Sequence, residues 1–373
     1  MSRRRRVWIA SGALVGATLM VLTLAMTGSV TAQRPGEGQA PTFQVDPWWP
    51  RPLPNNWLVG QVSGVAVDRH DHIWIVHRPR TLTEDERGAT TNPPRSLCCV
   101  PAPPVLEFDA EGALVRSWGG PGAGYEWPRN EHGIFVDHQD NVWIGGNDAK
   151  DHQILKFTRE GKFLLQIGMQ DQTGGDADTA HLGRPANVNV DPATNELFVA
   201  DGYRNHRVIV FDAQTGAYKR HWGANGRPPG DPSVKSFGNP VHCARLAKDG
   251  LLYVCDRSNN RIQVFKKDGT FVKEFLVAPA TRGAGSVWDV DVSHDGSQTW
   301  LYTADGENNH VWSLLRHTGQ VVGKFGRNGR QAGQLHWVHN LAVDSKGNVY
   351  TAEVDSGKRA QKFVFKGVGP ADN

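Results

Sequence analysis

One unit of sequence recurs six times along this chain, and this repeat restricts the fold more than any other feature. Each copy starts with a short alternating segment that ends at or near Asp, turns into a second apolar segment, and reaches a third after a polar loop. The copies begin at Ser63, His132, Ala186, His242, Trp288 and His339. Successive copies begin 46–69 residues apart. Repeats of about this length, built only from short strands, are typical of propeller blades.

The turns inside the copies support the same interpretation. Asp140-Asn141, Asp249-Gly250 and Asp295-Gly296 stand between the first and second apolar segments, and such residues tolerate the positive φ of tight hairpin turns. Second strands are expected over residues 73–76, 142–144, 197–200, 251–254, 300–303 and 349–352. The sequence therefore predicts an all-β fold, a six-bladed β-propeller with NHL-like four-stranded blades in one domain.

The last copy lacks a fourth strand of its own. The others have outer strands at residues 114–118, 163–167, 218–222, 271–276 and 320–325, whereas the chain stops soon after the sixth copy's third strand. We predict that a strand near residues 43–49 completes this blade and closes the ring, so that no sheet edge stays open. Residues 33–60 would then be the closing segment and residues 61–373 the propeller, with an insertion at residues 81–104.

The first 32 residues have the pattern of an export signal. Arginines at positions 3–6 precede an apolar stretch at residues 7–26 and a small-residue site, Val30-Thr31-Ala32, which indicates a signal peptide or an uncleaved N-terminal anchor. We therefore expect an exported protein, periplasmic or secreted, that meets a membrane only if the segment is retained. Without the leader, 37 Lys and Arg face 38 Asp and Glu, so no nucleic-acid partner is expected, and we expect a monomer.

Four cysteines fit an exported compartment, where disulfides persist. Cys243 and Cys255 flank one turn almost symmetrically and could face each other across a hairpin. Cys98 and Cys99 are adjacent in the insertion and could pair or stay free. Neither pair has the CxxC spacing of a zinc-thiolate site.

Histidine is the first residue of copies two, four and six: His132, His242 and His339. Alternate blades of a six-fold ring lie about 120° apart, and the first strand of each blade lines the axis. We expect the three imidazoles to converge there as a tripod with a fourth position open, which is the arrangement of catalytic zinc. The alternative is that each histidine only caps its own strand.

The loops between second and third strands return to the same face. They carry Arg78, Tyr203 and Arg257, which we predict to surround the histidines. Arginine forks suit a substrate carboxylate, and a tyrosine beside a metal can act as a base. The alternative is that these loops are surface turns with local ion pairs.

Several segments together resemble a known family. Gly60-Gln-Val-Ser-Gly-Val-Ala-Val-Asp68, Glu131-His-Gly-Ile134, Val199-Ala-Asp-Gly-Tyr203 and Cys255-Asp-Arg257 are similar to the catalytic core of peptidyl-α-hydroxyglycine α-amidating lyase, and the blades are similar to NHL repeats.

The resemblance implies a role for each candidate residue. It implies that His132, His242 and His339 bind Zn²⁺, that Tyr203 is the catalytic base, and that Arg78 and Arg257 are active-site arginines.

The resemblance also implies a Ca²⁺ on the axis, held by backbone carbonyls near Val65 and Ile134 and by one carboxylate. That carboxylate is replaced here by Asn340, whose amide oxygen can still bind Ca²⁺. Trp337 stands where the family has methionine, and Arg204 where it has cysteine.

The implied reaction is cleavage of a carbinolamide, an N–C(OH) unit, to an amide and glyoxylate. The substrate would be a small molecule or peptide-like compound with a carboxylate. One alternative is a lactonase-like metal-dependent hydrolase, although such sites use carboxylate and asparagine ligands. The other is a non-catalytic extracytoplasmic binding or scaffold propeller with an incidental metal.

Overall fold

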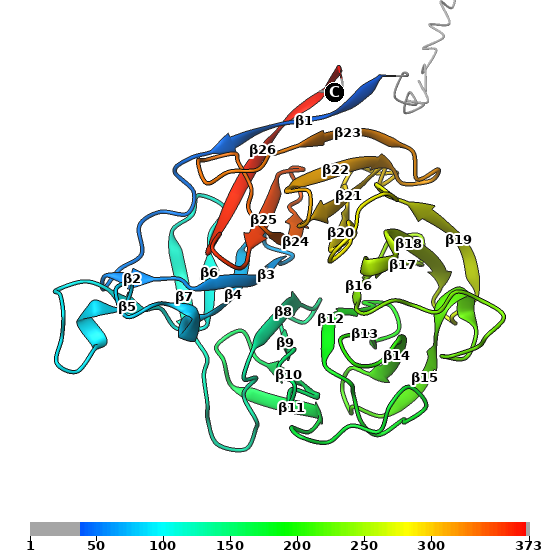
Figure 1. The fold of residues 1–373 in the computed structure, drawn as a ribbon, viewed down its shortest axis with the longest axis horizontal. Helices are drawn as coiled ribbons and strands as arrows, with labels where there is room; N and C mark the ends of the chain where they lie inside the picture. The colour runs from blue at the N-terminus through cyan, green and yellow to red at the C-terminus, as the bar shows by residue number, and fades with distance from the viewer. Residues whose placement is uncertain (1–37, 371–373) are drawn as a thin grey trace, which may run out of the picture. The chain divides into compact units, whose positions relative to one another are not determined.

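Six four-stranded antiparallel sheets surround a common axis in the computed structural model, which describes residues 38–370 (Figure 1). The predicted leader at residues 1–32 lies outside the described residues. Buried clusters fill the spaces between neighbouring blades, for example where Trp74 and Val76 of the first blade pack with Ile144 of the second. The predicted all-β, six-bladed propeller is confirmed.

Each blade runs outward from an inner strand at the axis. Blade 1 consists of β3 (Gln61–Val67), β4 (Ile73–Arg78), β6 (Val105–Phe108) and β7 (Leu114–Trp118). Blade 2 consists of β8 (Glu131–Val136), β9 (Val142–Gly146), β10 (Gln153–Phe157) and β11 (Phe163–Gly168). Blade 3 consists of β12 (Pro185–Val190), β13 (Glu196–Asp201), β14 (Arg207–Asp212) and β15 (Tyr218–Trp222).

The second half of the ring follows the same order. Blade 4 consists of β16 (Val241–Leu246), β17 (Leu251–Asp256), β18 (Arg261–Lys266) and β19 (Phe271–Leu276). Blade 5 consists of β20 (Asp289–Val292), β21 (Trp300–Asp305), β22 (His310–Leu315) and β23 (Val321–Phe325). Blade 6 consists of β24 (Val338–Val343), β25 (Val349–Glu353), β26 (Arg359–Pro370) and β1 (Gln39–Asp46).

The N-terminal strand closes the ring, as predicted. β1 pairs antiparallel with β26 from Gln39–Pro370 to Asp46–Lys362. The strand begins and ends earlier than the predicted residues 43–49, because the chain turns after Asp46 and Trp49 is instead buried against Phe108 and Tyr350. β20, in contrast, begins at Asp289, one residue later than the predicted start of the fifth copy at Trp288.

The Asp that directly follows several inner strands stabilises the next turn. The Asp137 Oδ1 atom accepts hydrogen bonds from the backbone amides of Gln139 and Asn141, each at 2.9 Å, and Oδ2 accepts one from the Trp143 indole, also at 2.9 Å. Asp68 and Asp344 make equivalent contacts in blades 1 and 6. The recurrent Asp therefore satisfies turn amides that would otherwise lack partners.

The insertion at residues 81–104 extends from blade 1. Its β5 (Val100–Pro101) pairs in parallel with β2 (Trp57–Leu58), on the left in Figure 1. The Lys358 Nζ atom ties it to blade 6 by contacts of 2.9 Å to the Thr81 carbonyl and 2.6 Å to Glu86. Among the residues described, no helix has the length and apolar character needed to cross a membrane.

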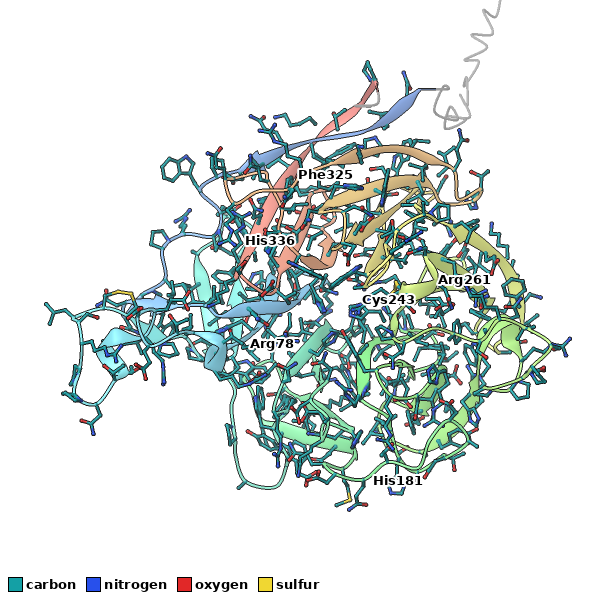
Figure 2. The ribbon with its side chains drawn as sticks, in the orientation of Figure 1. Arg78, His181, Cys243, Arg261, Phe325 and His336 are labelled. Carbon is teal, nitrogen blue, oxygen red and sulfur yellow. A yellow bond between two sulfur atoms is a disulfide. The ribbon has the colours of Figure 1, made fainter. Side chains whose placement is uncertain are left out.

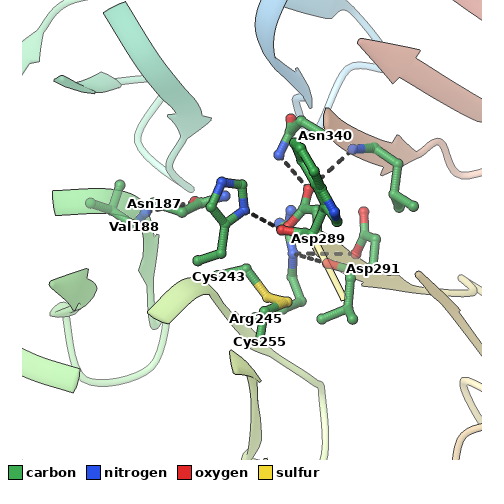
Figure 3. Close-up of a disulfide and its surroundings, with 12 residues drawn as sticks. Asn187, Val188, Cys243, Arg245, Cys255, Asp289, Asp291 and Asn340 are labelled. Carbon is green, nitrogen blue, oxygen red and sulfur yellow. Dashed lines mark hydrogen bonds and ion pairs between the residues drawn. A yellow bond between two sulfur atoms is a disulfide. The ribbon is translucent and has the colours of Figure 1, made fainter. Parts of the chain in front are cut away.

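Both cysteine pairs are disulfides. Cys243 lies directly opposite Cys255 in the β16–β17 ladder, so the hairpin places the two side chains together, and both are buried. Figure 3 shows this bond beside the axis. Cys98 and Cys99 form a bond between neighbouring residues within the insertion.

Candidate metal centre

Three imidazoles meet at the axis. His132, His242 and His339 lie at or next to the first residue of the inner strands β8, β16 and β24, and their ligand nitrogens all lie within 4.8 Å of one another. The ring centroids are 4.6–5.0 Å apart. The structure therefore brings together the three histidines that the repeat alignment selected.

The protein holds each imidazole in one tautomer. The Nδ1 atom of His132 lies 2.7 Å from the Ala186 carbonyl, and that of His339 lies 2.8 Å from the Ser63 carbonyl. His242 makes the same contact with the carbonyl of Trp288. A carbonyl oxygen only accepts, so each Nδ1 carries the proton and donates it. Each Nε2 is left with a lone pair, as metal binding requires.

Burial keeps these histidines neutral. All three side chains are at most 3% exposed, and desolvation lowers the pKa of each well below its usual range. The nearby cations Arg78 and Arg257 lower the pKa values of these imidazoles further. Neutral imidazole is the form that binds metal ions.

Tyr203 completes the cluster from the β13–β14 loop. Its hydroxyl lies 3.0 Å from Nε2 of His132 and 3.0 Å from Nε2 of His242. A hydroxyl has one proton, so it can donate to only one of these two nitrogens. At the other contact, a lone pair of the hydroxyl oxygen faces the lone pair of the second Nε2 atom, with no proton between them. A cation at the centre would relieve this conflict, so the donor set fits Zn²⁺.

The arginines beside Tyr203 lack acidic partners. The guanidinium of Arg78 contacts only neutral groups: the Glu131 carbonyl at 2.9 Å, the Gln61 side chain at 2.8 Å and Asn147 at 3.5 Å. Burial lowers the pKa of Arg78 to about 10. Figure 2 places Arg78 at the inner part of blade 1.

Arg257 has a similar environment. It donates to the Ala284 carbonyl at 3.0 Å and to the Tyr203 hydroxyl at 3.3 Å, and its guanidinium lies 4.3 Å from the Trp288 ring centroid. Within residues 38–370, neither Arg78 nor Arg257 forms a salt bridge with a carboxylate. Their charges are therefore available to an anionic ligand.

Two ion pairs hold the loops that carry Tyr203 and Arg257 in place. Asp201 pairs with Arg207 at 2.8 Å and Asp256 with Arg261 at 2.6 Å, so the last residue of the second strand is joined to the first residue of the third. Gly202 lies against the backbone of Val241, where an added Cβ would come within 2.0 Å of the carbonyl oxygen. The glycine therefore lets the tyrosine loop approach the strand that carries a histidine.

A cavity of about 270 Å³ opens at this end of the axis. Arg78, Tyr203, Arg257 and His339 line it, together with Trp337, which occupies the wall beside Trp288 with ring centroids 5.2 Å apart. The lining holds two arginines and aromatic groups against one carboxylate, Asp355, which suits a small ligand with a carboxylate and an apolar part.

Sequence reasoning missed three residues of this site. Arg184 donates to the Asn147 carbonyl at 2.9 Å, and its guanidinium lies 5.6 Å from the Tyr203 ring centroid. Gln61 and Asn147 hold Arg78. Asn147 directly follows β9, at the blade position where Arg78 ends β4 and Arg257 follows β17, and that correspondence could have revealed it.

The residues of the expected calcium site make other contacts. The Asn340 side-chain oxygen accepts a 2.6 Å hydrogen bond from the Val65 amide, and its nitrogen donates to Asp289. Val65 and Ile134 both lie in inner strands next to the axis. The amide oxygen expected to replace the carboxylate thus accepts a backbone hydrogen bond in this arrangement, and the calcium site stays a prediction.

Comparisons with known proteins agree with this architecture. The NHL repeat family model matches residues 241–265. A rat peptidylglycine alpha-amidating monooxygenase is 31% identical over 263 residues, which cover 65% of this chain and 26% of the rat protein. The match thus spans about a quarter of that relative.

Two other relatives match over more of their length. A Drosophila melanogaster peptidyl-alpha-hydroxyglycine alpha-amidating lyase 1 is 28% identical, over 85% of this chain and 59% of that protein. A mouse NHL repeat-containing protein 3 is 26% identical, over 96% of both.

A solved Bacteroides thetaiotaomicron structure of unknown function shares the fold, with a TM-score of 0.51 at 14% identity over 84% of this chain and 70% of that one. The chain is a six-bladed β-propeller with an NHL repeat, and its relatives include proteins named as peptidyl-α-hydroxyglycine α-amidating lyases.

Proposed function

We propose that the chain is a zinc-dependent lyase that cleaves a carbinolamide of the peptidyl-α-hydroxyglycine type into an amide and glyoxylate. The observation that carries this proposal is the set of three neutral imidazoles with Nε2 lone pairs directed at one point, next to a tyrosine hydroxyl. Relatives named as amidating lyases support it.

In this reaction the zinc ion would act as a Lewis acid at the substrate hydroxyl. Arg78 and Arg257 bind the substrate carboxylate, since both are cationic and lack acidic partners in the described chain. Tyr203 accepts the hydroxyl proton, the C–N bond breaks as the aldehyde C=O forms, and the leaving amide nitrogen receives a proton. Atoms balance without a further reactant.

Export is part of the proposal. A buried disulfide between Cys243 and Cys255 fits an oxidising compartment, and the leader pattern at residues 1–32 supplies the route. The substrate would then be encountered in the periplasm or outside the cell by a monomeric enzyme.

The competing function is a non-catalytic propeller. It is favoured by the match to an NHL repeat-containing protein over 96% of both chains. A metal-replete sample separates the two: the lyase releases glyoxylate from N-benzoyl-α-hydroxyglycine, and a scaffold releases none.

The matched variants are His242→Ala and His221→Ala. His221 lies on the outer strand β15, away from the hub, so its variant should keep zinc and turnover, while His242→Ala should lose both. Unchanged zinc content and glyoxylate release in His242→Ala would refute the proposal.

A further inference from the structure

A second and larger cavity lies at the opposite end of the axis. The histidines stand at the beginning of the inner strands, whereas this cavity, of about 540 Å³, is lined by the residues that end them and by the turns that follow, such as Val136, Leu246 and Val343. That volume is within the range of small-molecule sites. The proposed reaction uses no residue of this cavity.

Unpaired hydrogen-bond donors face this cavity from blade 4. The Nε atom of Arg245 lies 3.3 Å from the Val290 carbonyl and forms an ion pair with Asp291 at 3.5 Å. Figure 3 shows Arg245 beside Asp291. Neither terminal nitrogen of this guanidinium makes a hydrogen bond within the described chain. Lys248 also lines the cavity and, unlike Arg245, has no ion pair within the described chain.

The two carboxylates that line the cavity, Asp191 and Asp291, already accept several hydrogen bonds from the protein. The two oxygens of Asp291 accept bonds from the backbone amides of Val292, at 2.8 Å, and Val343, at 3.0 Å. Asp191 is bound by Lys267 at 2.7 Å and by its own turn. The Nδ1 atom of His138 is buried without a partner. The excess of donors and positive charge indicates an anionic ligand.

Part of the remaining wall is apolar. Val67, Phe135, Val190, Val292 and Ala342 come from five inner strands and surround the opening. A purely inorganic anion would leave this surface in contact with water, whereas a carboxylate with a short hydrocarbon chain would cover it.

We propose that this cavity is a binding site for a small monocarboxylate with an apolar chain. The Arg245 guanidinium and the Lys248 ammonium hold the carboxylate, and the chain packs against Phe135 and its neighbours. The site is independent of the proposed lyase activity, since it shares no residue with the histidine cluster.

The test uses the full-length zinc-loaded protein and hexanoate as the probe, with titration calorimetry as the measurement. Hexanamide is the neutral control of the same shape. Hexanoate should bind, and hexanamide should bind at least about tenfold more weakly, because it lacks the charge that the two cations recognise. Absence of hexanoate binding, or equal binding of the two compounds, overturns the proposal.

Variants assign the binding to this end of the axis. Arg245→Gln and Lys248→Gln should each weaken hexanoate binding at this cavity by about tenfold, whereas Arg257→Gln should weaken only a separate binding event at the histidine end. Lys248 is exposed, so its variant keeps the test valid if Arg245→Gln fails to fold. Loss of binding in Arg257→Gln with full binding in Lys248→Gln would place the ligand at the histidine site and overturn the proposal.

Discussion

Arg78 is a buried cation without an acidic partner, so replacing it should affect ligand binding much more than stability. It is 8% exposed, and burial lowers its pKa from the usual value for arginine to about 10. A shift of that size means that the charged form is disfavoured in the folded state by about 3 kcal/mol. The penalty is fully present below pH 10 and disappears as the pH rises toward the usual pKa of arginine.

The variant Arg78→Met removes this penalty but also removes two good hydrogen bonds, to the Glu131 carbonyl and the Gln61 side chain. An acceptor left without a donor costs about 1–3 kcal/mol, so the two effects nearly cancel. We expect the free energy of unfolding to change by less than about 2 kcal/mol. A carboxylate ligand should lose one charge-assisted contact and bind about ten- to a hundredfold more weakly.

Arg207 provides the matched control. It is also buried, but it pairs with buried Asp201 at 2.8 Å. Its replacement by Met leaves a buried carboxylate unpaired and should cost about 3–5 kcal/mol. Urea denaturation measures stability, and calorimetric titration with N-benzoylglycine measures carboxylate binding. If Arg78→Met proved less stable than Arg207→Met, or kept full affinity for N-benzoylglycine, the reasoning would be wrong.

Three further predictions concern the hub and its hairpin. Tyr203→Phe should keep its zinc but release glyoxylate at least about a hundredfold more slowly, because the proton acceptor is gone; metal analysis and a glyoxylate assay measure both. Replacing Cys243 and Cys255 by Ala should lower the free energy of unfolding by about 3 kcal/mol, because 12 residues separate them and the unfolded chain is no longer constrained; denaturant titration measures it. Burial raises the pKa of Asp289 from 3.8 to about 7, so its ionised form opposes folding, and its contribution to wild-type stability falls as the pH rises from 4 to 7. The stability of Asp289→Asn relative to wild type should therefore increase by up to about 4 kcal/mol between pH 4 and pH 8. Denaturant titrations in the presence of EDTA measure this difference.

Each of these expectations has a result that contradicts it. Full turnover in Tyr203→Phe would exclude the tyrosine as the proton acceptor. Unchanged stability without the disulfide would mean that the bond does not constrain the unfolded chain. A stability difference between Asp289→Asn and wild type that stays constant from pH 4 to pH 8 would show that Asp289 does not titrate in this range.

The six copies and their turn residues were sufficient to predict the ring, because strand alternation and hairpin chemistry are local properties of the chain. The position of His132, His242 and His339 at the start of alternate copies predicted their meeting point, since pseudo-symmetry relates equivalent positions. The pairing of Cys243 with Cys255 followed the same local logic of a hairpin.

What the sequence could not determine depends on contacts between blades. The carbonyls of Ala186, Trp288 and Ser63 fix the imidazole tautomers from neighbouring blades, and nothing near the histidines in sequence indicates them. The contacts of Arg184, the occupied oxygen of Asn340 and the donor-rich cavity at the far end also arise only when the ring closes. Sequence periodicity placed the residues on their strands, but the packing of blades far apart in the chain determined their partners and which charges stayed unpaired.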